Sequence, residues 1–541
     1  MSAWRAVARR WLALPPPRCR ALSSCEWVAL SDGTRLATRV TRPAGGGAAP
    51  LGTLLVRSDE IVHAPRRPLP LLAALLAEQG LAVVLQECRG LRASEGEFTP
   101  FVHEASDGAD ALGWLAKQPW FTPPLALAGF GYGGYAAFAA LSRSPLPAER
   151  LVVGYAARDP YAWLHAGGAL RLSATFEQAF ALGAAQRDAP DSFDVERALR
   201  HRPVREADRV GMRRLDWLRE WLDHPRRDDF WESRVAALPA HPPETLLLAG
   251  FGHPALAAQL ADREALSALA ATTATGSVAL EIRPGSAPTR RQALALLADA
   301  LRAAHGFVRS EPARRRSPVR VFEVRAGRWR ESATWPLPGA TSHRLYLRGE
   351  GLAQGAEGDG RLDAAPPGAA EPCDVFVYDP ADATPSAPSR ALRGDVLCYA
   401  SAALAAPLAL CGSVRAELHV ASDAPVTDFS ATLVEVDAAG FERPICDGIA
   451  RVEREAGLAS GAAQRVVVDC DAACWRVAAG SLLRLDIASA SHPRFDRAPN
   501  TREEPARAGA DAGVPARQTV FHDAARASCL ILESLETAGP P

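Results

Sequence analysis

The sequence predicts an N-terminal domain with a mostly parallel β-sheet covered by helices, followed by an all-β domain. Three observations lead to this. Short apolar runs alternate with helical segments from Leu51 to Phe307. A charged, tryptophan-rich helical segment interrupts the alternation over residues 156–243. After Pro318, short strands separated by Gly, Pro and Asp turns replace the helices. Alternation of strands and helices is typical of a parallel sheet with helices on both faces, and closely spaced short strands are typical of a sandwich.

The elements of the first domain follow in order along the chain. Apolar, β-branched runs predict strands over residues 51–56, 81–86, 125–128, 151–155, 245–248 and 278–282. Helical spacing predicts helices over residues 71–79, 104–117, 135–141, 256–269 and 290–304. One uncharged stretch, Phe121–Ser142, is as long as a membrane span, but its prolines and glycines favour a buried strand, a tight turn and a buried helix.

The second domain is predicted from eight short strands, with a long turn-rich loop over residues 349–370. The strands are expected over residues 319–324, 344–347, 375–378, 416–420, 431–436, 465–468, 482–487 and 528–532. The resulting organisation is a basic extension (1–25), a sheet-and-helix core (26–155 and 244–308), a helical lid inserted into it (156–243), a linker (309–318) and an all-β sandwich (319–535).

Composition excludes several classes of protein. The 541 residues are 48% hydrophobic and 23% charged, which is ordinary for a soluble globular chain. The net charge of −1 gives no basic field to recruit nucleic acid or an anionic membrane, so neither partner is expected. The ten cysteines contain no CxxC pair, so we predict no metal site, no cofactor and mostly buried free thiols.

The N-terminal extension is basic and free of acidic residues. Five arginines precede Glu26, the first acidic residue, and Trp4, Val7 and Trp11 share one helical face. Two interpretations remain open. The segment is typical of an organelle transit peptide, which implies a mitochondrial or plastid location. Alternatively, it is an unstructured basic extension or an artefact of the assigned start codon, and the protein is then cytoplasmic.

A glycine-rich turn between a predicted strand and a predicted helix carries the strongest motif. Residues 129–134 read Gly-Phe-Gly-Tyr-Gly-Gly and resemble the G-x-S-Y-x-G nucleophile elbow of one α/β-hydrolase group. That group contains the bacterial cocaine esterases, the α-amino-acid ester hydrolases and the X-prolyl dipeptidyl aminopeptidases. Similar passages recur in family order at residues 89–98, 104–108, 114–120, 224–231, 328–336, 378–380, 395–399, 427–429 and 494–501.

The resemblance covers residues 26–533 and implies both a fold and a reaction. It implies an α/β-hydrolase core, a helical insertion over the active site, and a C-terminal jelly roll like that of the X-prolyl dipeptidyl peptidases. The implied reaction is hydrolysis of an ester, amide or X-Pro bond through an acyl-enzyme. In that chemistry a serine attacks the carbonyl, a histidine takes its proton, and an acid orients the histidine. Backbone N–H groups and a tyrosine hydroxyl stabilise the oxyanion.

Four functional positions depart from the family pattern. Gly131 stands at the nucleophile position, His253 at the acid position, Ala287 at the histidine position and Glu60 at the oxyanion tyrosine position. A glycine has no side chain with which to attack, and a glutamate has the wrong charge to stabilise an oxyanion. Only the backbone N–H of Tyr132, which follows the elbow, is retained as a candidate binding group.

These substitutions predict a pseudoenzyme: a hydrolase scaffold that binds a small molecule, a peptide or a partner subunit. The alternative is an active hydrolase or dipeptidyl-peptidase that uses relocated residues, with His253 as a displaced base. A third option, carbohydrate binding by the jelly roll, rests on fold analogy alone. The sequence is compatible with a homo- or hetero-oligomer and does not identify the ligand.

Overall fold

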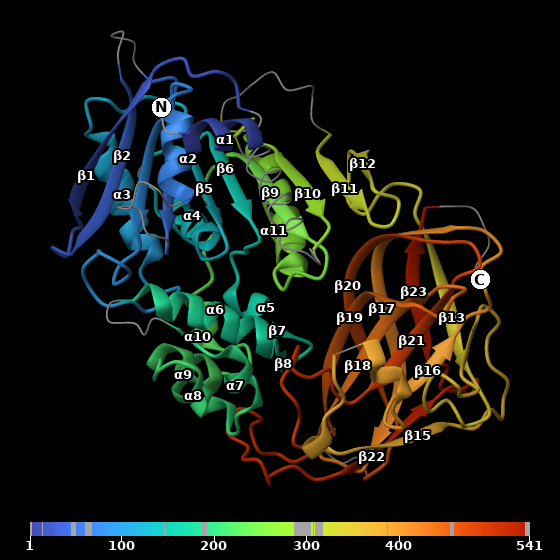
Figure 1. Ribbon diagram of the computed structural model, residues 1–541. Helices are drawn as coiled ribbons and strands as arrows, with labels where there is room; N and C mark the ends of the chain where they lie inside the picture. Colours follow the sequence, from blue (N-terminus) through green and yellow to red (C-terminus); the bar gives the residue numbers. More distant parts are fainter. Residues whose placement is uncertain are drawn as a thin grey trace. The chain divides into compact units, whose positions relative to one another are not determined.

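The computed structural model describes residues 3–12, 14–44, 50–59, 68–144, 146–186, 192–285, 305–306, 308, 317–386, 388–454 and 459–535. The chain divides into two compact units (Figure 1). The α/β unit comprises Met1–Trp163, Ala181–Asp191 and Asp228–Arg320. The β unit comprises Leu164–Phe180, Ser192–Arg227 and Val321–Pro541. Each unit is described by itself below.

The α/β unit contains a mixed sheet with the strand order β1-β2-β4-β3-β5-β6-β9-β10. Strands β3 to β10 run parallel to one another, whereas β2 runs antiparallel to both β1 and β4. This confirms the predicted fold class. The strands are β1 (Arg20–Ala29), β2 (Arg35–Ala44), β3 (Thr53–Ser58), β4 (Ala82–Glu87), β5 (Leu125–Phe130), β6 (Arg150–Gly154), β9 (Glu244–Gly250) and β10 (Val278–Arg283).

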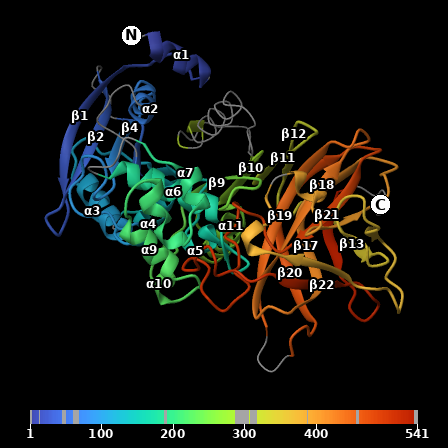
Figure 2. The ribbon, with the colours of Figure 1, turned by 60° about the horizontal axis from the view of Figure 1, so that its bottom comes forward.

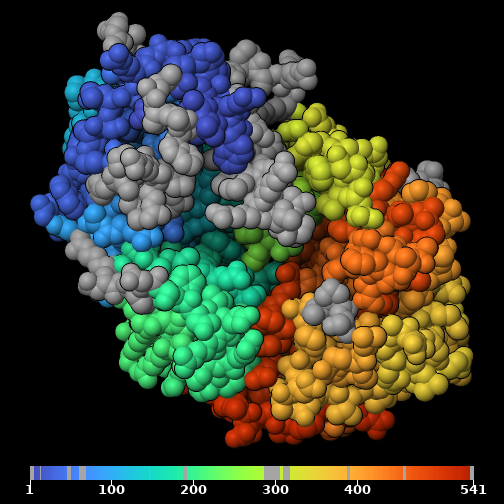
Figure 3. All heavy atoms as spheres, in the orientation of Figure 1, coloured from blue at the N-terminus to red at the C-terminus, as the bar shows by residue number. Residues whose placement is uncertain are grey.

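Strands β1 and β2 were not among the predicted elements. They lie at one border of the sheet in both ribbon views (Figures 1 and 2), and the dark blue residues form part of the surface of this unit (Figure 3). Most residues of β1 are exposed, among them Leu22 and Trp27. Because a strand at the edge of a sheet buries little apolar surface, its sequence carries no strong alternation of apolar and polar residues.

Four described helices accompany these strands: α2 (Pro68–Ala77), α3 (Glu104–Ala116), α4 (Tyr132–Ser142) and α11 (Leu256–Thr273). The core is apolar on both faces of the sheet, and every residue of β4 is buried. Leu76 of α2 packs into one cluster with Leu54, Leu85 and Leu248 from three strands. Each such leucine contributes about 1.5–3 kcal/mol through burial, so these runs determine the sheet. The helix predicted over residues 290–304 lies outside the described residues.

The N-terminal extension is folded where it is described. Helix α1 (Ala3–Trp11) packs against α2, and Leu12 lies in a small cluster with Leu75. Arg5 and Arg9 both form ion pairs with Glu78. The boundary expected after residue 25 falls inside β1, which is paired with β2 from its first residue onward. Among the described residues, we find no helix that is both long and apolar enough to cross a membrane.

The segment between β6 and β9 is helical, as the tryptophan-rich sequence predicts. It contains α5 (Pro160–Leu164), β7 (His165–Ala166), β8 (Ala169–Leu170), α6 (Leu172–Ala185), α7 (Val195–Arg200), η1 (Val204–Glu206), α8 (Ala207–Gly211), α9 (Asp216–Asp223) and α10 (Asp229–Glu232). Trp217 and Trp221 pack together with ring centroids 4.9 Å apart. The segment was expected to be one insertion, but its residues are shared between the two units.

The β unit is built on eleven strands in the order β15-β22-β17-β23-β13-β14-β16-β21-β18-β19, with β20 paired to β17. Strands β11 (Val319–Glu323) and β12 (Arg328–Ser332) precede them. The eleven are β13 (Thr341–Arg348), β14 (Arg361–Asp363), β15 (Asp374–Tyr378), β16 (Leu397–Ala400), β17 (Leu408–Ser422), β18 (Val426–Val436), β19 (Glu442–Glu453), β20 (Gln464–Val477), β21 (Leu482–Ala488), β22 (Ala516–Phe521) and β23 (Cys529–Ser534).

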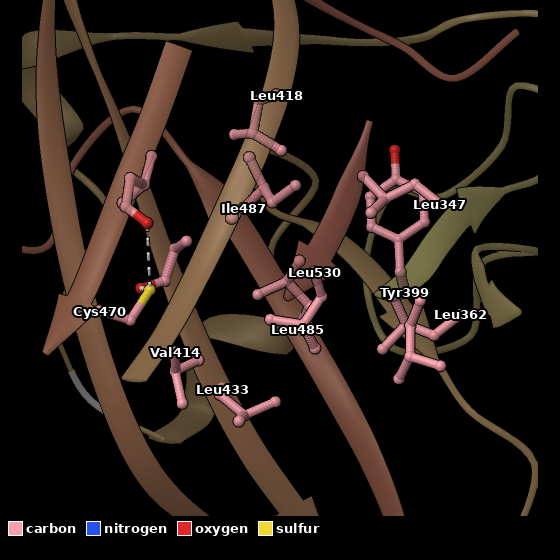
Figure 4. Close-up of a cluster of buried hydrophobic side chains, with 14 of the residues drawn as sticks. Leu347, Leu362, Tyr399, Val414, Leu418, Leu433, Cys470, Leu485, Ile487 and Leu530 are labelled. Carbon is pink, nitrogen blue, oxygen red and sulfur yellow. Dashed lines mark hydrogen bonds between the residues drawn. The ribbon is translucent and has the colours of Figure 1, made fainter. Parts of the chain in front are cut away.

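The core of the β unit is a cluster of buried leucine, valine and aromatic side chains. Figure 4 shows Leu418, Leu485, Ile487 and Leu530 from three strands pointing into one interior. The predicted loop over residues 349–370 contains β14, which pairs with β13 and β16. Its length of three residues explains why a pattern of alternating residues did not reveal it.

One pair of cysteines departs from the expectation of free thiols. Cys411 of β17 and Cys474 of β20 are direct cross-strand partners and form a disulfide. Cys88, Cys398, Cys446, Cys470 and Cys529 are buried and free. The two paired cysteines are far apart in sequence, and only the strand register brings them together, so their spacing gave no signal.

His492 makes the β unit sensitive to acid. Burial, together with the nearby charges of Arg202 and Arg497, lowers the pKa of His492 to about 4. The folded state therefore takes up this proton at lower pH than the unfolded state, so stability is full above the unfolded pKa of about 6.5 and falls as the pH falls towards 4. We expect His492→Gln to remove about 2–3 kcal/mol of this pH dependence.

The measurement is chemical denaturation from neutral pH down to acidic pH, with His241→Gln as the matched control. His241 is exposed, so its substitution controls for the removal of an imidazole group as such. A His492→Gln profile that coincides with that of the unmodified protein would contradict the assignment.

Candidate active site

The elbow predicted at residues 129–134 is a sharp turn between β5 and α4. Gly131 lies at the turn with φ of 53° and ψ of −127°. Its N–H donates to the carbonyl of Gly154 at 2.9 Å, and its own carbonyl accepts from the N–H of Gly134 at 2.9 Å. A positive φ of this kind strains any residue with a side chain by about 1–3 kcal/mol, and glycine avoids that cost.

The glycines of the elbow are not equivalent. A Cβ atom on Gly129 would lie 2.0 Å from the carbonyl oxygen of Gly133, and one on Gly133 would lie 2.8 Å from the carbonyl oxygen of Arg57. A Cβ atom on Gly131 would meet no atom within 4 Å. Close packing therefore requires glycine beside the elbow, whereas the nucleophile position has room for a side chain and lacks one.

Tyr132 is the first residue of α4, so its N–H lies beyond the reach of any helical carbonyl. Within the described residues, no backbone carbonyl outside the helix accepts from this N–H. The Tyr132 side chain points into the protein, where its hydroxyl donates to Glu104 and accepts from the N–H of Phe101 at 3.3 Å. The predicted backbone role of Tyr132 is therefore compatible with its position, and its hydroxyl serves the interior.

A buried cluster of charged side chains lies beside the elbow and contacts it through the hydrogen bond between Glu104 and Tyr132. This cluster was not predicted from the sequence. Arg89 binds Asp107 through two hydrogen bonds of 2.7 and 3.0 Å, and Arg57 lies 3.8 Å from the same carboxylate. Arg57 also donates to the carbonyl of Glu104 at 2.7 Å. Asp107 lies in the first turn of α3, where acidic residues are commonly solvated, but it is almost fully buried. Burial raises the pKa of the Glu104 carboxyl above its usual range.

His253 follows β9 at the same edge of the sheet as Gly131, because β5, β6 and β9 run parallel and end in register. Its Nδ1 accepts from the N–H of Ala255 at 3.2 Å, just before α11. Its ring lies against the Tyr155 ring with centroids 5.2 Å apart. These contacts hold the His253 ring beside Tyr155 and the residues that precede α11.

Two of the four substituted positions, Glu60 and Ala287, lie outside the described residues, as does Ser286. The described chain stops beside both, at Asp59 after β3 and Gly285 after β10. Gly285 lies so close to the carbonyl of Phe251 that a Cβ atom there would overlap it. The loops after β9 and β10 are thus adjacent. Burial raises the pKa of Asp59 above its usual range.

Among the described residues, the Cys88 thiol is a reactive group near the elbow that does not supply a nucleophile. Cys88 is fully buried at the end of β4, and burial raises the pKa of its thiol well above the usual range. It therefore stays protonated and unreactive at neutral pH. No cluster of three or more His, Cys, Asp or Glu side chains suited to a metal ion occurs in the part of the chain that the structure describes.

An apolar cavity of about 320 Å³ adjoins the elbow within the α/β unit. Gly129, Phe130 and Gly133 contribute to its lining, as does Asp59. The remaining lining is largely aliphatic and comes from α1, α2, β3 and the segment ending at Val308. Such a cavity is suited to the apolar part of a ligand that binds beside Gly131.

Comparison with known proteins places both units in known families. Residues 32–251 match the model of the X-Pro dipeptidyl-peptidase S15 family. Residues 312–531 match the X-Pro dipeptidyl-peptidase C-terminal non-catalytic domain. The chain is 28% identical over 540 residues to a cocaine esterase from Rhodococcus sp. (strain MB1 Bresler), covering 88% of this chain and 92% of that protein.

Solved structures share the same fold over nearly the whole chain. An aminopeptidase from a marine sediment archaeon, Thaumarchaeota archaeon, superimposes with a TM-score of 0.78 at 18% identity and covers 96% of this chain and 98% of its own. An α-amino acid ester hydrolase does so with a TM-score of 0.77 at 19% identity and the same coverage. A CocE/NonD family hydrolase from Staphylococcus aureus gives 0.68 at 15% identity, covering 96% of this chain and 97% of its own.

Proposed function

Because the chain belongs to the X-Pro dipeptidyl-peptidase (S15) family of hydrolases, we propose that it is a non-catalytic member, which binds a carbonyl-containing ligand without hydrolysing it. The observation that carries the proposal is Gly131 at the apex of the elbow. The turn has the strained geometry that presents a nucleophile in α/β-hydrolases, but the residue on it has no nucleophilic atom.

The surroundings of Gly131 support loss of catalysis rather than relocation of it. His253 uses its Nδ1 to accept from the backbone beside α11, and the Cys88 thiol is buried and protonated. A serine hydrolase needs its nucleophile and its base within hydrogen-bond reach of each other. The contacts described for His253 and Cys88 do not form such a pair.

The proposed ligand is a small ester, amide or peptide. Tyr132 begins α4 directly after Gly131, and its N–H can donate to a carbonyl oxygen. The apolar cavity beside Gly129 and Phe130 can hold the attached aliphatic or aromatic group. Binding through these groups requires no serine.

A fluorophosphonate probe and a chromogenic peptide test both halves of the proposal. We expect the probe to label no residue of the purified protein, because Gly131 at the elbow has no side chain for it to modify. We expect alanyl-prolyl-p-nitroanilide to raise the apparent Tm and to slow amide exchange over residues 129–135 without release of nitroaniline. Nitroaniline release that survives Gly131→Ala would overturn the loss of catalysis. The absence of both stabilisation and protection would overturn the binding role.

A further inference from the structure

A second cavity, of about 340 Å³, lies wholly within the β unit and is lined by charged and hydroxyl side chains. Its walls come from β18, β19 and β21, from the short helix η3 (Pro388–Leu392), and from Ser173 and residues 491–494. Its volume falls in the range of small-molecule sites, about 300–1,000 Å³. The lining of this cavity is polar, whereas the lining of the cavity beside the elbow is apolar. The two cavities therefore suit different kinds of ligand.

Arg390 is the distinctive group of this cavity. Only 3% of it is exposed, and its two terminal nitrogens donate to the hydroxyls of Thr432 at 3.0 Å and Ser430 at 3.2 Å. Its Nε has no hydrogen-bond partner. The carboxylates of Asp486 and Asp447 are the main negative charges acting on it, but among the described residues neither forms an ion pair with it. A buried guanidinium normally pairs with an anion, because burying an unpaired charge is costly.

The carboxylates of the same cavity are already paired. Asp447 contacts Arg494, while Glu442 and Asp486 share Arg484, with N–O distances of 2.6 and 2.7 Å. One arginine between two carboxylates leaves a local excess of one negative charge. Arg390 therefore has no carboxylate of the described residues in direct contact, and Glu442 and Asp486 have one arginine between them, although the Asp486 charge also acts on Arg390.

From this arrangement we infer that the cavity binds a small zwitterion of the amino-acid type, either a free amino acid or a dipeptide. Its carboxylate would accept from Arg390, and its ammonium group would donate to the Glu442–Asp486 pair. A simple anion would satisfy Arg390 alone, and it would add a negative charge beside three carboxylates. A zwitterion compensates both local charges without changing the net charge of the site. The hydroxyls of Ser386, Thr432 and Ser491 can complete the hydrogen bonding.

Calorimetric titration of the full-length chain tests this inference. The probes are L-alanine, L-leucine and L-alanyl-L-alanine, compared with isobutyrate, isopropylammonium and D-glucose. Isobutyrate and isopropylammonium match L-alanine in shape, and each lacks one of its two charges. We expect at least one zwitterion to bind below about 1 mM and each single-charge analogue to bind roughly ten-fold or more weakly.

Arg390→Lys keeps the positive charge but removes Nε and the fork geometry, and we expect it to weaken binding by roughly ten-fold or more. Arg517→Gln is the matched control, because Arg517 is an exposed arginine of β22 outside the cavity. Hydrogen exchange on the unmodified protein provides a test that needs no variant. The bound zwitterion should protect residues 384–394 and 489–495.

The inference is overturned if no zwitterion binds at about 10 mM. It is also overturned if isobutyrate or D-glucose binds as tightly as the best zwitterion, if a well-folded Arg390→Lys variant binds normally, or if the protected residues lie elsewhere.

Discussion

Gly131→Ser alone is expected to leave the protein inactive toward short acyl esters. The serine side chain fits, since a Cβ atom at this position meets nothing within 4 Å. We expect it to lack a base, because the resemblance to the family assigns Ala287 to the histidine position and His253 to the acid position. A serine without its base stays a protonated, weak nucleophile, and the members of a triad act as one unit. The measurement is hydrolysis of p-nitrophenyl acetate with the variant at high concentration.

Restoring the whole triad is expected to have the largest effect on rate. Gly131→Ser combined with Ala287→His and His253→Asp should produce measurable ester hydrolysis and fluorophosphonate labelling at residue 131. Loss of an intact triad costs on the order of 10⁶ in rate, so even a poorly aligned triad has a large range to recover. Adding Glu60→Tyr should raise the rate further by supplying an oxyanion donor in place of a carboxylate.

The matched control carries Gly131→Ala with the same two loop substitutions, and it should remain inactive. Activity in this control would mean that the hydrolysis comes from groups outside the elbow. Activity of Gly131→Ser alone, equal to that of the triple variant, would contradict the role assigned to the missing base.

Gly129→Ala is expected to cause a large loss of stability in the α/β unit. Its new Cβ would lie 2.0 Å from the carbonyl oxygen of Gly133 and 2.6 Å from the nitrogen of Gly134, and both are backbone atoms that cannot rotate away. The start of α4 would have to separate from β5, at a cost that we place above about 4 kcal/mol. Differential scanning calorimetry and near-ultraviolet circular dichroism measure the effect.

Gly131→Ala serves as the comparison within the same turn. Its Cβ enters open space, so only its positive φ opposes the substitution, at about 1–3 kcal/mol. We therefore expect Gly131→Ala to fold and to melt a few degrees lower, whereas Gly129→Ala folds poorly. Equal effects of the two substitutions would contradict the assigned packing of the elbow.

The parts of the fold predicted from sequence are those with strong local patterns. The apolar runs of β3, β5, β6, β9 and β10 are buried on both faces of the sheet, so each appears as a continuous hydrophobic segment. The edge strand β1 and the three-residue β14 leave no such pattern. Strands β1 and β14 form because they pair with neighbouring strands. The alternation of apolar and polar residues in a single sequence carries no information on that pairing.

The same division applies to the candidate site. The elbow was predictable because its spacing of glycines has a local cause in the turn. The cluster of Arg57, Arg89, Asp107 and Glu104 was not, because it assembles from β3, the loop after β4, and α3. Charged residues far apart in sequence carry no sign that they will be buried together, and Asp107 accordingly resembled an ordinary residue near a helix start.

The open space at Gly131 affects how readily this residue can change during evolution. A glycine codon is a single base change from a serine codon, and the turn accepts either residue without repacking its neighbours. A lineage can therefore lose or regain the elbow serine while the fold stays intact. A histidine codon lies more than one base change from an alanine codon, so under the proposed loss of catalysis a change at position 287 would be a slower step than a change at position 131. Related chains should accordingly vary at position 131 while keeping glycine at 129 and 133, where the backbone leaves no room for substitution.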